Sequence, residues 1–172
     1  MTPGEIARRP AVDSDRPFLF ELYASAREAE LAQVPWTPQQ KHAFIAAQFE
    51  AQLSGYRQTH PGADHDILLR EGAAVGRLYL ARLPDRIHIL DITIAPAERN
   101  RGIGAQVLAE IVSDAERAGL PVTIYVESFN RSLRLFQRLG FEVAVQDGFQ
   151  LLLEHRPSAA ELNRAAPPPA GG

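Results

Sequence analysis

Residues 86–128 hold the pattern that most restricts how this chain can fold. A run rich in β-branched residues ends at Ala95-Pro96, and an arginine-rich segment with two glycines, Arg99-Asn-Arg-Gly-Ile-Gly104, follows it. Apolar residues then recur with the spacing of one helical face, at Val107, Leu108, Ile111 and Ala115. A second β-branched run, PVTIYVES, comes next. Strand, helix and strand in this order predict a right-handed crossover between two parallel strands.

Turn and capping signals place further elements on both sides of this crossover. Thr37 and Gln40 have the spacing of a capping box, with Pro38 at the first helical position. The other predicted elements are a strand at 6–12, a helix from the capping segment 13–15 to about 30, antiparallel strands at about 66–70, 74–82 and 86–94, a short helix at 130–139 and a hairpin at 141–155. The predicted fold class is α+β, with a mixed, mostly antiparallel twisted sheet, helices on both faces and a central parallel β-α-β crossover.

Composition narrows the class of protein further. The chain has 172 residues, which suits one domain, and we expect it over 1–155 with a disordered tail rich in Pro, Ala and Gly over 156–172. The net charge of −3 gives no general attraction to nucleic acid or an anionic membrane. The absence of cysteine excludes thiolate chemistry, and the five histidines lack metal-ligand spacing, so no metal is expected. With no membrane-spanning run and no signal core, we expect a soluble cytoplasmic protein.

The glycine pair before the helix suggests a phosphate-binding loop, because helix N-termini attract anions. A P-loop is excluded, since no Gly-Lys pair exists in the chain. A dinucleotide fingerprint fails as well, because Val107 stands where a third Gly or Ala is needed and no acidic residue follows about 20 positions later. A simple glycine turn that enters a helix remains an alternative.

The segment Arg99–Gly104 resembles the Arg/Gln-x-x-Gly-x-Gly/Ala loop of the GNAT N-acyltransferase superfamily. Asn130, followed ten residues later by Gly140-Phe141, is similar to the second signature of that family, and the order of elements fits over residues 5–154. The resemblance implies a GNAT-type fold and an acetyl-CoA-dependent N-acetyltransferase that acts on a primary amine. A CoA-binding domain without catalytic activity and a purely structural module remain alternatives.

The resemblance also implies how acetyl-CoA would be held. Backbone N–H groups from Arg101 to Ala105 would cradle the pyrophosphate, and the pantetheine arm would lie along the backbone of residues 92–94. Asn130 would bond the arm, although it could act only as a helix cap, and Arg101 could be only a solvated arginine. The implied cofactor-binding residues are Ile92, Thr93, Ile94, Arg99, Asn100, Arg101, Gly102, Ile103, Gly104, Ala105, Asn130 and Phe136.

Acyl transfer to an amine also needs proton transfer. A lysine-like amine, with a pKa of about 10.4, must lose a proton to a base, for which Asp91 and Glu127 are the candidates and His88 a weaker one. Asp91 stands in an apolar strand and could instead be the partner of an arginine. The family usually places a tyrosine general acid at the position of Phe136, which has no proton to give. Tyr125 is the candidate substitute, or else a core tyrosine.

The acceptor is a small-molecule or peptide amine that the sequence does not identify. The family builds the acceptor site from the first two helices, their connection around Trp36 and the last hairpin. Gln48, Gln52 and Tyr56 could line that site or form a solvated face. The segment 143–153 is a candidate surface for a homodimer, as in many family members.

Overall fold

The computed structural model describes residues 4–158, which form seven strands, four α-helices and two short 3-10 helices. The elements are β1 (Ile6–Pro10), η1 (Asp13–Asp15), α1 (Arg16–Ala32), α2 (Pro38–Thr59), β2 (Asp64–Arg70), β3 (Ala73–Arg82), β4 (Ile87–Ile94), η2 (Pro96–Glu98), α3 (Ile103–Ala118), β5 (Val122–Glu127), α4 (Leu133–Arg138), β6 (Glu142–Asp147) and β7 (Gln150–His155). The strand order is β1-β2-β3-β4-β5-β7-β6. The α+β prediction is confirmed. Part of the tail predicted over 156–172 lies outside the described residues.

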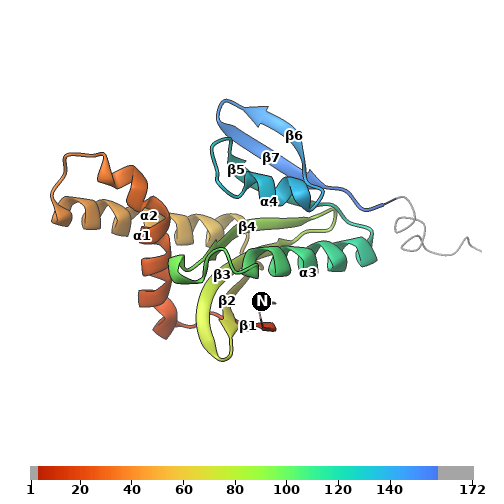
Figure 1. Ribbon diagram of the computed structural model, residues 1–172, viewed down its shortest axis with the longest axis horizontal. Helices are drawn as coiled ribbons and strands as arrows, with labels where there is room; N and C mark the ends of the chain where they lie inside the picture. The colour runs from red at the N-terminus through yellow and green to blue at the C-terminus, as the bar shows by residue number, and fades with distance from the viewer. Residues whose placement is uncertain (1–3, 159–172) are drawn as a thin grey trace, which may run out of the picture. The chain divides into compact units, whose positions relative to one another are not determined.

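The predicted crossover is the central connection of this topology. Strand β4 pairs in parallel with β5, with Ile87 opposite Val122, while the pairs β1–β2, β5–β7 and β6–β7 are antiparallel. Helix α3 connects the two parallel strands (Figure 1). The apolar stripe predicted for this helix is buried, because every one of its four side chains is at most 1% exposed.

The starts of the first two helices differ in how well local sequence predicts them. The capping box of α2 is confirmed, since the Thr37 N–H donates to the Gln40 side chain at 2.9 Å and the Gln40 N–H to Thr37 Oγ1 at 3.2 Å. The capping role expected for Asp13–Asp15 at α1 is wrong. The Asp15 carboxylate instead accepts the N–H of Val12 at 2.8 Å and bonds both Nη atoms of Arg9 at 2.7 Å.

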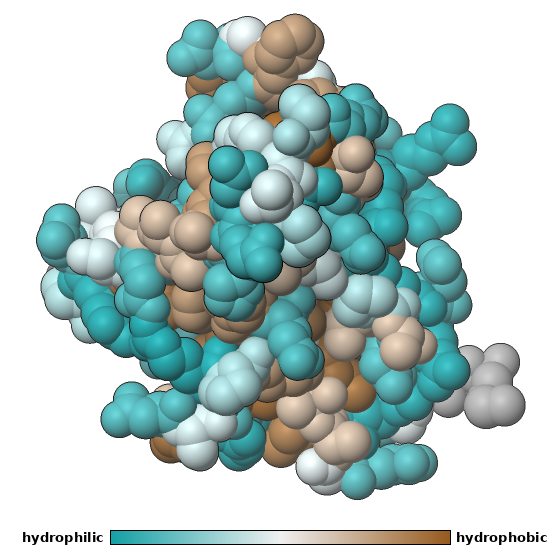
Figure 2. All heavy atoms as spheres, turned by 90° about the vertical axis from the view of Figure 1, so that its left-hand side faces the viewer, coloured by the Kyte–Doolittle hydropathy of each residue, from teal (hydrophilic) through white to brown (hydrophobic). Residues whose placement is uncertain are grey.

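The described residues divide into two compact units, one of residues 4–79 and 91–103 and the other of residues 80–90 and 104–158. In the first unit, α1 and α2 contact each other, and the ring of Phe49 packs against Phe20 and Tyr23. The buried side chains of this unit include Leu19, Leu22, Phe49, Leu53, Ile67, Leu68 and Val75. On the face drawn in Figure 2, hydrophilic side chains dominate and apolar ones lie among them in small groups.

The core of the second unit includes side chains from α3, α4, β5 and β7. Its fully buried side chains include Val107, Leu108, Val122 and Leu153. Gly119 and Gly140 follow α3 and α4 with φ of 71° and 92°, left-handed values that suit a glycine at the end of a helix. Within residues 4–158, every helix falls short of the length and apolar character that a membrane crossing demands.

Candidate functional site

The segment between η2 and α3 is built so that a helix N-terminus is open to an anion. Asn100 and Gly102 have φ of 61° and 77°, in the left-handed region, and α3 begins directly afterwards at Ile103. The first four N–H groups of a helix have no intrahelical acceptor, and the positive end of the helix dipole lies with them. Ile103 is 1% exposed, so its side chain belongs to the core and not to the surface of the loop. Gly104 and Ala105 form the first turn of α3 with it.

The two arginines of the loop have different surroundings. The Arg99 Nε donates to the carbonyl oxygen of Ile94 at 3.2 Å, which ties the loop to the end of β4. Arg101 is 53% exposed and lies 3.4 Å from Glu98, which also forms an ion pair with Arg70 at 2.8 Å. Arg101 is therefore an exposed cation beside the loop, as the solvated-arginine interpretation expects, and its contact with a phosphate stays a prediction.

At Gly76 on β3, the end of β4 lies so close that no room remains for a side chain. A Cβ atom added to Gly76 would stand 2.5 Å from the carbonyl oxygen of Thr93. The N–H of Ala95 donates to the carbonyl of Val75 at 2.8 Å. Ile92, Thr93 and Ile94 are half-buried, and nothing in the described residues tests their predicted contact with a pantetheine arm.

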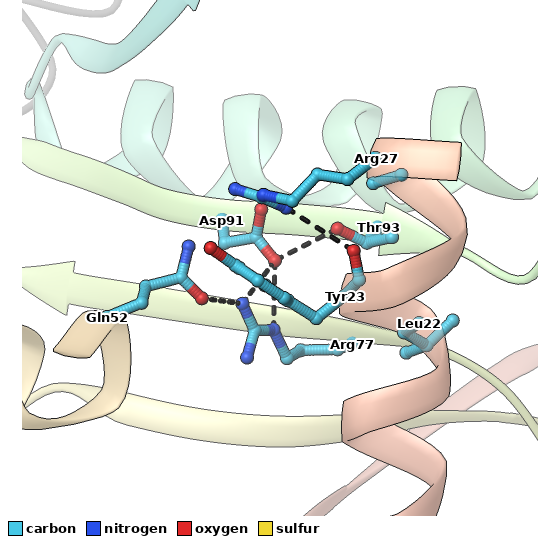
Figure 3. Close-up of a pocket in the computed structure, with 8 residues that line it drawn as sticks. Leu22, Tyr23, Arg27, Gln52, Arg77, Asp91 and Thr93 are labelled. Atoms are coloured by element: carbon cyan, nitrogen blue, oxygen red, sulfur yellow. Dashed lines mark hydrogen bonds and ion pairs between the residues drawn. The ribbon is translucent and has the colours of Figure 1, made fainter. Parts of the chain in front are cut away.

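Asp91 is the partner of a buried arginine, as the alternative interpretation of this residue expected. Its Oδ2 accepts from the Nε of Arg77 at 2.8 Å, lies 2.8 Å from the Nη2 of the same guanidinium, and accepts the Thr93 hydroxyl at 2.9 Å. The Arg77 side chain is 3% exposed, and its Nη2 also donates to Gln52 Oε1 at 2.8 Å. Figure 3 shows this network between α2 and the two strands.

A cavity of about 50 Å³ lies over this network, within the first unit. Its lining residues come from α1, α2, β3 and β4: Leu22, Tyr23, Ala26, Arg27, Gln52, Arg77, Asp91 and Thr93. The guanidinium carbon of Arg27 lies 3.5 Å from the centroid of the Tyr23 ring, in a cation–π contact. Two of the elements predicted to build the acceptor site, α1 and α2, therefore contribute polar groups to one cavity.

Other titratable groups of the first unit lie close to Arg77 and Asp91. Burial raises the pKa of Tyr56 to about 12, and the charge of Asp91 adds to the rise. Burial, helped by the positive charge of Arg77, lowers the pKa of His65 to about 4, so this imidazole is neutral near pH 7. Burial also raises the pKa of Tyr23. Gln48, Gln52 and Tyr56 are half-buried, and Gln52 lines the cavity.

The candidate proton-transfer residues of β5 are exposed. Tyr125 is 55% exposed, so the core-tyrosine alternative is wrong, and its ring contacts that of His88 edge-on at 5.5 Å. His88 is buried in β4, with its Nδ1 2.8 Å from the Thr123 hydroxyl. Glu127 is exposed at the end of β5. Any catalytic role of these residues stays a prediction.

Asn130 and Phe136 have structural roles in the second unit. The Asn130 side-chain oxygen accepts the N–H of Ser132 at 2.8 Å, which is the cap-like interaction expected as the alternative. Phe136 is 3% exposed, and its ring packs edge-on against Phe141 at 5.4 Å. The predicted cofactor contacts of both residues are untested.

Sequence reasoning missed Arg77, the buried cation at the centre of the network. A signal for it exists, because an arginine within the apolar run AAVGRLYLAR must have a partner if the strand is buried. Tyr23 and Arg27 were missed as site residues because only the fold shows which face of α1 lines the cavity. No cluster of possible metal ligands occurs within residues 4–158.

Comparison with known proteins gives the family. The model of the Acetyltransferase (GNAT) family matches residues 17–141, and the chain therefore belongs to the GNAT acetyltransferase family. No curated protein sequence matches the chain. The predicted resemblance is confirmed.

Solved structures of acetyltransferases have the same fold. The PaiA N-acetyltransferase from Thermoplasma acidophilum, solved in complex with coenzyme A, is 18% identical, with a TM-score of 0.67 over 88% of this chain and 99% of that one. A GNAT acetyltransferase from Staphylococcus aureus is 13% identical, with a TM-score of 0.62 over 90% and 100%. The ribosomal-protein-S18-alanine N-acetyltransferase from Escherichia coli is 16% identical, with a TM-score of 0.57 over 90% and 95%. At these identities the likeness shows the fold alone.

Proposed function

We propose that this protein is an acetyl-CoA-dependent N-acetyltransferase that transfers an acetyl group to a primary amine. The observation that carries the proposal is the loop before α3, where two left-handed residues, Asn100 and Gly102, lead into a helix N-terminus. Free N–H groups and a positive dipole end at that point suit a pyrophosphate. The coenzyme A complex of the Thermoplasma relative supports the same cosubstrate.

The residues of the loop fit this group. The N–H groups from Arg101 to Ala105 would bind the pyrophosphate, and Arg99 and Arg101 would add positive charge. The backbone of 92–94 and the Asn130 side chain would hold the arm. A backbone N–H near the acyl carbonyl would stabilise the oxyanion of the tetrahedral intermediate.

The proposed reaction releases one proton from the amine nitrogen and one leaving group, the CoA thiolate. The amine nitrogen attacks the thioester carbonyl carbon, a C–N bond forms, the C–S bond breaks, and CoA departs as a thiolate. The proton that leaves the nitrogen needs an acceptor. Asp91 is our first candidate, because its Oδ1 has no hydrogen-bond partner within residues 4–158 while its Oδ2 is fully engaged. Glu127 is the second candidate.

The departing thiolate meets no tyrosine at position 136. A thiol pKa of about 8.5 makes CoA a tolerable leaving group without help. Tyr125 is the proposed donor if one is used, since its side chain is exposed on β5. General acid help is worth about 10²–10⁴-fold in rate, so its loss predicts a slow enzyme.

A second candidate function is a CoA-binding domain without turnover. The buried Phe136, in place of the usual acid, is the observation that favours it. We further propose that the protein is soluble and cytoplasmic. We also propose a homodimer, which the exposed Val143, Val145 and Phe149 of the last hairpin support. Size-exclusion chromatography with light scattering tests the dimer.

Calorimetric titration with acetyl-CoA, with NADH as the control ligand, tests the proposed function. We expect micromolar acetyl-CoA binding and no response to NADH, followed by release of CoA thiol when a panel of amines is added. Binding without thiol release from any amine would favour the CoA-binding domain. Absence of acetyl-CoA binding would contradict both functions.

A further inference from the structure

The cavity over Arg77 and Asp91 offers more hydrogen-bond donors than acceptors to a ligand. Within residues 4–158, the Gln52 amide nitrogen and the Tyr23 hydroxyl have no hydrogen-bond partner, and Arg27 bonds only the Tyr23 carbonyl, at 3.4 Å. On the acceptor side, Asp91 contributes Oδ1, because Oδ2 already receives three donors. The cavity therefore presents one carboxylate oxygen beside a cluster of donors.

The charges of the lining residues also favour an anionic ligand, because their sum is positive. Arg77 and Asp91 neutralise each other through their ion pair, which leaves the guanidinium of Arg27 as the uncompensated charge of the lining. The cation–π contact with Tyr23 fixes this guanidinium over the ring without neutralising it. An anionic group in the cavity would be attracted by Arg27, and a ligand that carries only positive charge would be repelled by it.

The volume limits what can enter. A cavity of about 50 Å³ exceeds the roughly 10–15 Å³ that one water needs, so it has room for a compact head group of a few heavy atoms. A carboxylate next to an amine is such a head group, and its negative end matches the donors while its positive end matches Asp91 Oδ1. A longer substituent would have to extend out of the cavity.

We propose that the acceptor is an α-amino acid or a small molecule with the same head group, an amine with a neighbouring carboxylate. Arg27, with Gln52 and Tyr23, binds the carboxylate, and Asp91 Oδ1 receives the amine. This inference rests on the proposed acetyltransferase function, since it names the substrate class of that reaction. Diamines and simple alkylamines, which lack the anion, are poor ligands of this cavity.

Matched pairs of ligands test this substrate class. Each L-amino acid of a panel of twenty is titrated calorimetrically against the protein saturated with CoA, beside its decarboxylated amine where one exists, such as leucine with 3-methylbutylamine and lysine with 1,5-diaminopentane. We expect at least one amino acid to bind ten times or more tighter than its amine. Equal or tighter binding of the amines would overturn the proposal, and so would the absence of binding by every amino acid.

Two variants locate the selectivity. Arg27→Met retains the apolar stem but removes the charge, and we expect it to reduce the preference for the amino acid at least tenfold. Arg57→Met is the matched control, because Arg57 is exposed on α2 and does not line the cavity, and we expect it to keep the preference. Loss of selectivity in both variants, or in neither, would overturn the assignment to Arg27.

The same ligand pairs, offered as acceptors in the thiol-release assay with acetyl-CoA, separate failure of the substrate class from failure of the function. Thiol release with decarboxylated amines as the preferred acceptors would uphold the acetyltransferase and overturn the amino-acid inference. Selective amino-acid binding without thiol release would uphold the cavity assignment and contradict catalysis.

Discussion

Gly76 on β3 lies so close to Thr93 on β4 that a Cβ atom on the glycine would stand 2.5 Å from the threonine carbonyl oxygen. Real Cβ atoms do not approach a carbonyl oxygen this closely, so the two backbones would have to separate. The same strand segments hold Arg77 and Asp91, whose ion pair depends on their spacing. The absence of a side chain at position 76 is therefore a condition for the cavity.

Gly76→Ala is expected to lower the free energy of unfolding by about 2 kcal/mol, as overpacking does. Urea unfolding followed by circular dichroism measures the change. Gly55→Ala is the matched control, because Gly55 lies inside α2 with nothing within 4 Å of its added Cβ. There the same substitution should raise the free energy of unfolding by about 0.5–1 kcal/mol. Equal effects at both positions would contradict the close approach at Gly76.

Gly104→Glu is expected to abolish acetyl-CoA binding, because it places bulk and negative charge in the first turn of α3. Titration calorimetry measures the loss, with a thermal melt to verify folding. Gly62→Glu adds the same side chain at a position with open space around it and should leave the affinity unchanged. Unchanged affinity in the Gly104 variant would refute the phosphate-loop interpretation.

Asp91→Ala is expected to lower the free energy of unfolding by about 3 kcal/mol, because it leaves the buried Arg77 without its counter-ion. Chemical denaturation measures this loss. Asp85→Ala removes a carboxylate that is 73% exposed and pairs with Arg86 at 3.5 Å, so its effect should stay below about 1 kcal/mol. Similar small effects in both variants would mean that Arg77 finds another partner.

Phe136→Tyr is expected to leave the affinity for acetyl-CoA unchanged and to lower the free energy of unfolding by about 1–3 kcal/mol. The added hydroxyl would enter a site where the ring is 3% exposed and packs against Phe141. Calorimetry and a denaturant titration measure the two quantities. A tenfold fall in affinity would show that residue 136 packs against the cofactor.

Acid should weaken the fold in two steps that different residues control. The folded-state pKa of His65, lowered to about 4 by burial, lies below the ordinary value of about 6.5, so the unfolded chain binds the extra proton first. Stability then falls as the pH drops from about 6.5 to 4, by on the order of 2 kcal/mol, and His65→Phe should remove this loss. A wild-type stability that stays constant in this interval would contradict the burial of a neutral imidazole.

The second step belongs to Asp15. The hydrogen bond from Arg9, with that from the Val12 N–H, lowers the pKa of its carboxyl to about 2. The contribution of this carboxylate is present above pH 4 and is lost as the pH falls towards 2. Asp15→Asn should lower stability at pH 7 and flatten the curve below pH 4. A curve with the wild-type slope there would rule out the pairing with Arg9.

Features that depend on neighbouring residues could be predicted from the sequence. The capping box of Thr37 and Gln40 and the helix-ending Gly119 need only a few residues on either side, and the β-α-β crossover needs only the order of three segments. The pair of Arg77 and Asp91 spans two strands, and its existence depends on a register that the sequence does not state. The exposure of Tyr125 depends likewise on what covers one face of β5. The predicted capping role of Asp15 was wrong for another reason, because Arg9 binds the carboxylate that would have capped α1.

The left-handed angles of Asn100 and Gly102 have a consequence for how fast an anion binds before α3. Asn100 and Gly102 already have φ of 61° and 77° in the folded chain. The entropy cost of ordering this turn therefore falls on folding and not on ligand binding. Association should then be a single fast phase whose rate rises linearly with ligand concentration, without a slow isomerisation. Salt should slow the approach of the anion while leaving the number of kinetic phases at one.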